Sequence, residues 1–266
     1  MRADDIAALM PYMTAEERGE LTKLLAHDKT VWRPQPGPQS TAYNSTADIT
    51  GYGGAAGGGK TDLMCGTMLT RHERGIIFRR EATQLVGIID RLAELIGTRD
   101  GYNGPAKLWR SNGRQIEFGS CPHLGDEAKY QGRPHDFIGF DEATNFLEAQ
   151  VRFLLGWLRT TSPNQRCRAI LTFNPPTTSE GRWVIKFFAP WLDDKHPNPA
   201  KPGELRWFAT VNGSDLEVES GDRFVLVDGV PSYDFDPRKH RAEEIIQPLS
   251  RTFIPSRVSD NPFLAS

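Results

Sequence analysis

The sequence predicts an α/β fold with a mostly parallel central sheet flanked by helices, together with a small lid or linker subdomain. Three observations lead to this prediction. Strand and helix signals alternate from about residue 47 to 189, which is typical of a parallel sheet with crossover helices. An apolar run at 49–52 enters a glycine-rich turn that a helical pattern follows. Beyond Pro190 the composition changes to proline-rich loops and short β-type runs.

We expect three segments along the chain. Residues 1–31 form a helical lead, residues 32–190 form the core, and residues 191–266 form the lid or linker subdomain. The pattern from Thr14 to Glu17 fits a helix capping box in the lead. The stretch 32–39 contains three prolines, which remove backbone donors, so it predicts a strap that is not helical.

Periodicity and turn signals place the individual elements. The expected core strands are 49–52, 75–79, 137–140 and 168–173. The expected core helices are 60–71, 81–96 and 146–158. A hairpin turn at 111–113 joins two short strands, 107–110 and 114–118. In the last segment we expect strands at 205–211 and 223–227 and a helix at 237–246.

Composition limits the class of protein. The 266 residues carry 32 Lys+Arg against 34 Asp+Glu, so the molecule is not basic all over, although a local basic face for nucleic acid stays open. No apolar run reaches 18 residues, and acids near the start argue against a secretory leader. The 3 cysteines are widely spaced, which suits a reducing compartment. We expect a soluble cytoplasmic protein without a membrane partner.

A phosphate-binding (Walker A) motif lies between the first expected core strand and helix. Residues 54–61, Gly-Ala-Ala-Gly-Gly-Gly-Lys-Thr, match G-x-x-x-x-G-K-[ST] in full. Glycines let backbone N–H groups face phosphate oxygens, and the helix N-terminus adds a favourable dipole. Lys60 is expected to reach the β- and γ-phosphates, and Thr61 to coordinate Mg²⁺. A flexible glycine-rich loop is the alternative. The candidate nucleotide-binding residues here are Gly54, Gly57, Gly58, Gly59, Lys60, Thr61 and the adjacent Asp62.

An acidic pair (Walker B) ends the expected strand 137–140. Asp141 is expected to hold Mg²⁺, and Glu142 to orient and deprotonate the attacking water. Apolar strands often end in acids at a helix start, so the pair is informative only beside the phosphate loop. Together the motifs predict a P-loop NTPase of the additional-strand, catalytic-glutamate type that uses ATP and Mg²⁺. We expect its catalytic carboxylate on the strand beside the phosphate-loop strand.

With these motifs the chain resembles the ATPase half of the large terminase subunit of tailed bacteriophages, the motor that packages viral DNA. The resemblance covers roughly residues 32–262. The ordered set of motifs is much more specific than either phosphate-site motif alone. It consists of Gly-Gly-Ala-Ala-Gly-Gly-Gly-Lys-Thr (53–61), Lys-Tyr-Gln-Gly-Arg (129–133), Phe-Ile-Gly-Phe-Asp-Glu-Ala (137–143), Leu-Thr-Phe-Asn-Pro-Pro (171–176), Gly-Arg-Trp-Val (181–184) and, within 251–262, Arg-Thr-Phe-Ile-Pro and Asp-Asn-Pro.

The resemblance implies roles outside the two motifs. Residues 172–174 correspond to a coupling segment that senses the γ-phosphate through Asn174, whereas a simple turn at this point is the alternative. Gln39 corresponds to a glutamine that recognises adenine, and Gln35 competes for that role.

An arginine finger is also expected, because the transition-state charge on the γ-phosphate needs an organised cation. Arg133 is the first choice, acting on a neighbouring subunit beside the catalytic residues Glu142 and Lys60, and Arg79 or Arg80 is the second. Some family members carry an arginine inside the phosphate loop, where this chain has Ala56.

The family comparison also suggests partners and an absence. Family members continue into a nuclease, whereas this sequence ends just after 260–262, so we expect no nuclease activity in the chain. The implied partners are double-stranded DNA, the portal protein and the small terminase subunit. A homo-oligomeric ring is implied during packaging, with a monomer in isolation as the alternative. The implied location is the host cytoplasm, at the procapsid portal.

Two other functions stay open at this point. One is a helicase-like or partition-like DNA ATPase, and the other is a nucleotide-gated assembly protein with little turnover. The presence of Glu142 favours hydrolysis over the assembly protein, and the 172–174 segment favours terminase over the helicase.

Overall fold

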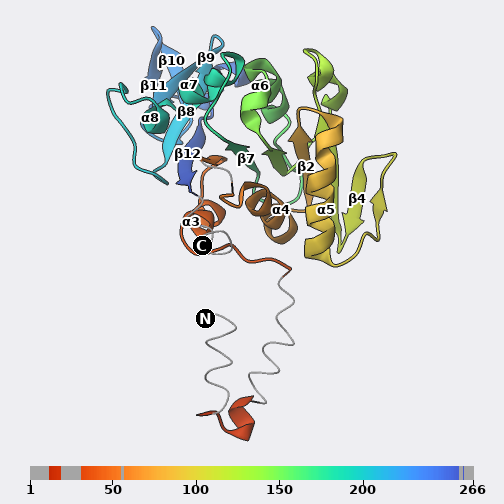
Figure 1. The fold of residues 1–266 in the computed structure, drawn as a ribbon. Coiled ribbons are helices and arrows are strands. Elements are labelled where there is room, and N and C mark those ends of the chain that lie inside the picture. Colours follow the sequence, from red (N-terminus) through yellow and green to blue (C-terminus); the bar gives the residue numbers. More distant parts are fainter. Residues whose placement is uncertain (1–11, 19–30, 55–56, 258–259, 261–266) are drawn as a thin grey trace.

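The computed structural model describes residues 12–18, 31–54, 57–257 and 260. Its largest feature is a ten-stranded sheet in the order β3-β4-β5-β2-β6-β7-β1-β12-β8-β9. The strands from β5 to β12 in this order run parallel, and antiparallel strands extend both ends. Figure 1 shows the β4 hairpin on one side of the molecule and β8 on the other. The predicted mostly parallel α/β sheet is therefore confirmed.

The central strands β2, β6 and β7 are buried on both faces, which explains their apolar runs. Two core clusters fill the two faces: one contains side chains of α4 and α5, and the other contains side chains of α6 and α7. The parallel strands are β1 (Ile49–Gly54), β2 (Arg74–Arg79), β5 (Arg114–Ser120), β6 (Phe137–Phe140), β7 (Arg168–Phe173) and β12 (Leu249–Ser256). The helices are α3 (Pro38–Asn44), α4 (Lys60–Arg71), α5 (Leu85–Ile96), α6 (Glu148–Leu155), α7 (Trp183–Phe187) and α8 (Ala189–Leu192).

Most elements expected in the core are present. Helix α4 has the predicted bounds, and α5 ends where Gly97 adopts a left-handed φ of 83°. The predicted capping box is confirmed, because the Thr14 N–H donates to Glu17 Oε2 at 2.8 Å and the Glu17 N–H donates to Thr14 Oγ1 at 3.2 Å. The rest of the helical lead lies outside the described residues.

Three expectations about helices need correction. The strap is partly helical, because α3 begins at Pro38, and proline is tolerated in the first turn of a helix. The helix expected at 146–158 is shorter and spans Glu148–Leu155. The helix expected at 237–246 is wrong: two short 3₁₀ turns, Pro237–Lys239 and Ala242–Glu244, occupy that stretch.

The last part of the chain joins the main sheet. Strand β12 pairs in parallel with β1, and β8 (Arg206–Val211) and β9 (Ser214–Val218) continue the sheet beyond it. Of the strands in the described residues, only β10 (Val225–Val227) and β11 (Val230–Ser232) form a separate two-stranded sheet. The segment boundaries at 31/32 and 190/191 stay predictions, but β8, β9 and β12, which all follow residue 191, share a sheet with the phosphate-loop strand. Strands β3 (Tyr102–Asn103) and β4 (Leu108–Ser111) form the opposite end.

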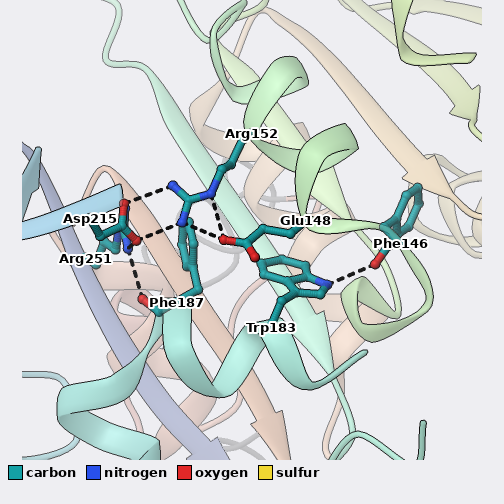
Figure 2. Close-up of polar contacts among 7 residues, drawn as sticks. All are labelled: Phe146, Glu148, Arg152, Trp183, Phe187, Asp215 and Arg251. Atoms are coloured by element: carbon teal, nitrogen blue, oxygen red, sulfur yellow. Dashed lines mark hydrogen bonds and ion pairs between the residues drawn. The ribbon is translucent and has the colours of Figure 1, made fainter. Parts of the chain in front are cut away.

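A partly buried ionic cluster joins this added part to the core (Figure 2). Asp215 of β9 accepts paired hydrogen bonds of 2.7–2.9 Å from Arg152 of α6 and from Arg251 of β12. Arg251 also donates to the carbonyl oxygen of Phe187 at 3.0 Å. Burial alone would raise the pKa of Asp215, but the two guanidinium groups hold it well below its ordinary value. The cluster therefore joins α6, α7, β9 and β12.

Among the described residues, no helix is long and apolar enough to cross a membrane.

Candidate nucleotide site

The phosphate loop leaves β1 at Gly54 and enters α4 at Lys60, as the motif predicts. Three of its glycines, Gly54, Gly57 and Gly59, have positive φ values that only glycine adopts easily. Gly54 has a φ of 143°, and a Cβ there would lie 2.1 Å from the carbonyl oxygen of Ser256. Gly59 has a φ of 68°, and a Cβ there would lie 2.6 Å from Nε2 of Gln39. The glycines are therefore needed for the close approach of neighbouring backbone and side chains.

Two side chains hold the loop through hydrogen bonds to its carbonyl oxygens. The hydroxyl of Tyr52 donates to the carbonyl oxygen of Gly58 at 3.0 Å. Nε2 of Gln39 donates to the carbonyl oxygen of Gly59 at 3.1 Å, and its Oε1 accepts from the N–H of Gln35 at 2.6 Å. Gln39 is buried, with both ends of its amide engaged in shaping the loop. The adenine role of Gln39 or Gln35 stays a prediction.

Asp141 lies opposite the loop at the end of β6. Its Oδ2 accepts a hydrogen bond from Thr61 Oγ1 at 3.2 Å, and its Oδ1 accepts one from Thr172 Oγ1 at 2.6 Å. The aspartate is 2% exposed, so its two oxygens are held in one orientation. Strand β7, which carries Thr172, lies between β6 and the phosphate-loop strand β1. The expectation that the catalytic carboxylate sits on the strand beside the phosphate-loop strand is therefore wrong. This intervening β7 is the additional strand of the predicted class.

Glu142 follows in a left-handed conformation with φ of 56°, which turns its side chain out of the strand. Its Oε2 accepts from Nδ2 of Asn145 at 3.1 Å and lies 2.8 Å from a guanidinium nitrogen of Arg79. The side chain lines the pocket above Thr61 and Lys60. A carboxylate in this position is available as a general base.

Arg79, at the end of β2, contacts both acids. Its Nε and one Nη lie 2.8 and 2.6 Å from Oδ2 of Asp141, and its other Nη binds Glu142. The neighbouring Arg80 points elsewhere and donates to Oε1 of Gln150 at 2.9 Å. The structure thus distinguishes two arginines that the sequence left equivalent.

Arg133 does not line the nucleotide pocket. Its guanidinium pairs with Glu117 and lies 5.6 Å from the ring centre of Tyr130. Its role as a finger toward a neighbouring subunit stays a prediction.

The pocket has a volume of about 550 Å³. Burial lowers the pKa of Lys60 from its ordinary value, and the carboxylates of Asp141 and Glu142 oppose that shift. Among the predicted residues, the lining includes Gly57, Gly59, Lys60, Thr61, Asp62, Glu142 and Asn174. Gly54, Gly58, Gln39 and Asp141 lie behind this surface.

One wall of the pocket was not predicted. It comes from one face of α5 and the residue before it, through Gln84, Gly87, Ile88 and Arg91. Arg91 donates from Nε to Oδ1 of Asp62 at 2.7 Å, and Trp32 donates from Nε1 to Oδ2 at 2.8 Å. Asp62 is thus held between the strap and α5. These four residues follow one another at helical spacing, so the sequence shows that they share one face. It does not show that this face adjoins the phosphate loop.

The donor set around Thr61 and Asp141 fits Mg²⁺. This cation prefers oxygen ligands and keeps several waters, so one hydroxyl and one carboxylate are sufficient from the protein. Because Arg79 and Thr61 both bind Oδ2 of Asp141, the guanidinium competes with a cation for that oxygen. No group of His, Cys, Asp or Glu within the described ranges forms a three-ligand metal cluster.

Neither the sequence models of protein families nor the curated proteins give a match to this chain. Among solved structures, the fold is similar to the large terminase of bacteriophage HK97, with a TM-score of 0.47 and 11% identity over 64% of this chain and 39% of that one. It is similar to the large terminase ATPase domain of Thermus phage P74-26, with a TM-score of 0.45 and 15% identity over 65% and 80% of the two chains. It is also similar to the large terminase of a thermophilic bacteriophage in complex with ADP, with a TM-score of 0.40 and 17% identity over 53% and 38%. The match thus spans about two fifths of the HK97 chain and of the ADP-bound chain, and these neighbours belong to the family that the sequence resembles.

Proposed function

We propose that this chain is an ATP-hydrolysing motor domain of the kind that packages viral DNA. The observation that carries the proposal is the convergence of two motifs 80 residues apart, with Thr61 Oγ1 bonded to Asp141 Oδ2 at 3.2 Å. A glycine-rich loop that merely happens to contain Gly-Lys-Thr has no reason to meet an acidic pair in this way. The ordered terminase motifs in the sequence support the packaging role.

The residues divide the chemistry between them. Backbone N–H groups of the loop and Lys60 bind and orient the phosphates. Glu142 orients a water molecule and takes its proton, while the water oxygen bonds to the γ-phosphorus and the bond to the β–γ bridging oxygen breaks. Thr61 and Asp141 would hold Mg²⁺, which when bound neutralises charge on the phosphates. ADP and inorganic phosphate are the products.

The assembly follows from the same proposal. The partners are double-stranded DNA, the portal protein and the small terminase subunit, and the site of action is the procapsid portal in the host cytoplasm. A ring of copies lets Arg133 of one subunit act on the nucleotide of the next, whereas Arg79 already contacts the acidic pair within its own chain.

The test is the replacement Glu142→Gln, which keeps the shape of the side chain and removes the base. We expect the steady-state rate of Mg²⁺-dependent ATP hydrolysis to fall at least about 100-fold, because a positioned base contributes about 10²–10⁴. Nucleotide affinity, measured by calorimetry, is expected to change little. The matched control is Glu180→Gln, an exposed glutamate outside the pocket. A rate close to the wild-type rate in Glu142→Gln would show that the base is assigned to the wrong residue, and absence of hydrolysis in the wild type would favour the nucleotide-gated assembly protein.

A further inference from the structure

A second charged pocket lies at the end of the sheet opposite the nucleotide. We infer that this pocket, lined by Arg71, Arg166 and Arg168, binds a backbone phosphate of double-stranded DNA. The inference rests on the proposed motor function for the identity of the nucleic acid, and on the pocket itself for the phosphate. The pocket has a volume of about 320 Å³ and lies between the residues after α3, the end of α4 and the start of β7.

Arg168 forms the floor of this arginine pocket. It is 2% exposed, yet its recorded partners are neutral: Nη1 donates to the carbonyl oxygen of Tyr43 at 2.9 Å, and Nη2 donates to Thr50 Oγ1 at 3.1 Å and to the carbonyl oxygen of Ala42. Its Nε is buried without a hydrogen-bond partner in the described part of the chain. These contacts cap the last turn of α3, but they leave the positive charge uncompensated.

The other two arginines add to this charge. Arg166 donates from Nη1 to the carbonyl oxygen of Ser45 at 3.0 Å. Arg71 donates from Nε to the hydroxyl of Tyr43 at 2.7 Å and stacks 4.6 Å from the centre of that ring, with its side chain exposed. Burial, together with the charges of Arg166 and Arg71, lowers the pKa of Arg168 to about 9. A buried cation such as Arg168 is stable only when an anion offsets it, or at a cost to the fold, and two exposed arginines beside it increase that cost.

The carboxylates nearby are engaged elsewhere. Asp48 accepts from the N–H and Oγ of Ser250 at 2.8 and 2.7 Å. Asp136 accepts from the backbone N–H groups of residues 73 and 74, and exposed Glu73 accepts from Ser162 Oγ at 3.1 Å. No carboxylate occurs among the described residues that line the pocket. The charge of Asp48 offsets part of that of Arg166, but no carboxylate reaches the described pocket lining, so a ligand anion would complete the compensation there.

The surroundings favour a chain of phosphates over a single anion. Arginine presents a planar fork that matches phosphate oxygens, and the amides of Asn44, Asn164 and Gln165 at the rim are typical backbone-contacting groups. A second hollow, at the hairpin 110–115, carries Arg110 and Arg114. Arg114 donates from Nε to the carbonyl oxygen of His72, the residue after Arg71, so the hairpin lies next to the arginine pocket. A row of arginines fits the repeated charge of a duplex.

Two rigid elements join the arginine pocket to the nucleotide site. Helix α4 carries Lys60 at its start and Arg71 at its end, about 16 Å apart along the axis at a rise of about 1.5 Å per residue. Strand β7 begins at Arg168 and ends beside Asn174 in the nucleotide pocket. A duplex phosphate at one end and the nucleotide at the other would therefore contact the same two elements.

The test measures binding of a labelled 30-base-pair duplex by fluorescence anisotropy across a range of salt concentrations. For Arg71→Ala/Arg166→Ala we expect Kd to rise at least about tenfold near 0.1 M salt. We also expect the slope of log Kd against log salt to fall by about 0.9, the value for loss of the contact with one phosphate. The matched control is Arg238→Ala/Arg241→Ala, which removes the same charge from exposed arginines outside both hollows.

Additional variants and a phosphate titration distinguish the possible results of this test. A thermal melt shows whether the double variant is folded. If it is not, the single variant Arg71→Glu, at an exposed side chain, takes its place, and we expect it to lose DNA binding as well. Inorganic phosphate is titrated in parallel at constant ionic strength: phosphate binding that the variants lose, with duplex affinity unchanged, means a free-anion site and overturns the inference. Unchanged duplex affinity and salt slope also overturn it. Duplex binding by a wild type that does not hydrolyse ATP would refute the proposed function and leave this pocket's role intact.

Discussion

The two ends of the parallel strands differ in whether their positive charges are paired with carboxylates. At the nucleotide end, cations and carboxylates are paired: Arg79 with Asp141 and Glu142, and Arg91 with Asp62. At the other end, the arginine pocket has no carboxylate in its described lining. A site with paired charges can replace its internal ion pairs by contacts with a ligand that carries both positive and negative charge, such as a nucleotide with its metal ion. An unbalanced site needs an anion alone.

The partly buried cluster of Asp215 and Glu148 with Arg152 and Arg251 is a third, balanced arrangement, and breaking it tests how much the balance of charge contributes to stability. Replacing Asp215 by Asn leaves Arg251 without a carboxylate and leaves Arg152 with Glu148 alone, so we expect the free energy of unfolding to fall by about 3 kcal/mol. The measurement is chemical denaturation at pH 7. Asp236→Asn is the matched control, because its pair with Arg238 is exposed and is expected to contribute about 0–1 kcal/mol. An equal loss in both variants would contradict the bracing role of the cluster.

The same variant has a defined pH dependence. Because the folded-state pKa of Asp215 is lowered, its stabilisation is fully present above the unfolded-state value of about 3.9 and is lost as pH falls through the folded-state value. The difference in unfolding free energy between wild type and Asp215→Asn is therefore expected to stay constant from pH 7 to about pH 4 and to shrink below it. A difference that already shrinks between pH 7 and pH 5 would contradict the lowered pKa.

The smallest predicted effect concerns the pairing inside the nucleotide site. Arg79→Ala frees Oδ2 of Asp141 from a competing cation, so we expect about fivefold less Mg²⁺ to give half-maximal nucleotide binding, equivalent to about 1 kcal/mol. Arg80→Ala is the matched control, since that guanidinium binds Gln150 instead. A Mg²⁺ requirement that rises in Arg79→Ala would mean that the arginine helps to bind the metal-nucleotide complex.

The fold could be predicted wherever the signal is local. Helix α4 and the parallel strands β1, β2, β6 and β7 have apolar runs and punctuating glycines that need no knowledge of distant residues. Strand β12 was missed because it does not read as a central strand. It buries Ser250, Arg251 and Thr252 and contains Pro255, although prolines are uncommon inside sheets. Its partner β1 lies about 200 residues away in the sequence.

The candidate site shows the same limit. The phosphate loop and the acidic pair are contiguous motifs, so their residues could be named in advance. The contact of Arg79 with the acids depends on β2 lying beside β6, and the wall formed by Arg91 depends on how α5 packs. The arginine pocket combines Arg71 with Arg166 and Arg168, nearly 100 residues later, and only the sheet order brings them together.

The most direct test of the motor is the rate of ATP hydrolysis per subunit, measured against protein concentration with and without double-stranded DNA. A ring in which one subunit supplies an arginine to the next predicts a rate per subunit that rises with concentration and rises further with DNA. A rate that is flat with concentration and indifferent to DNA would contradict the account.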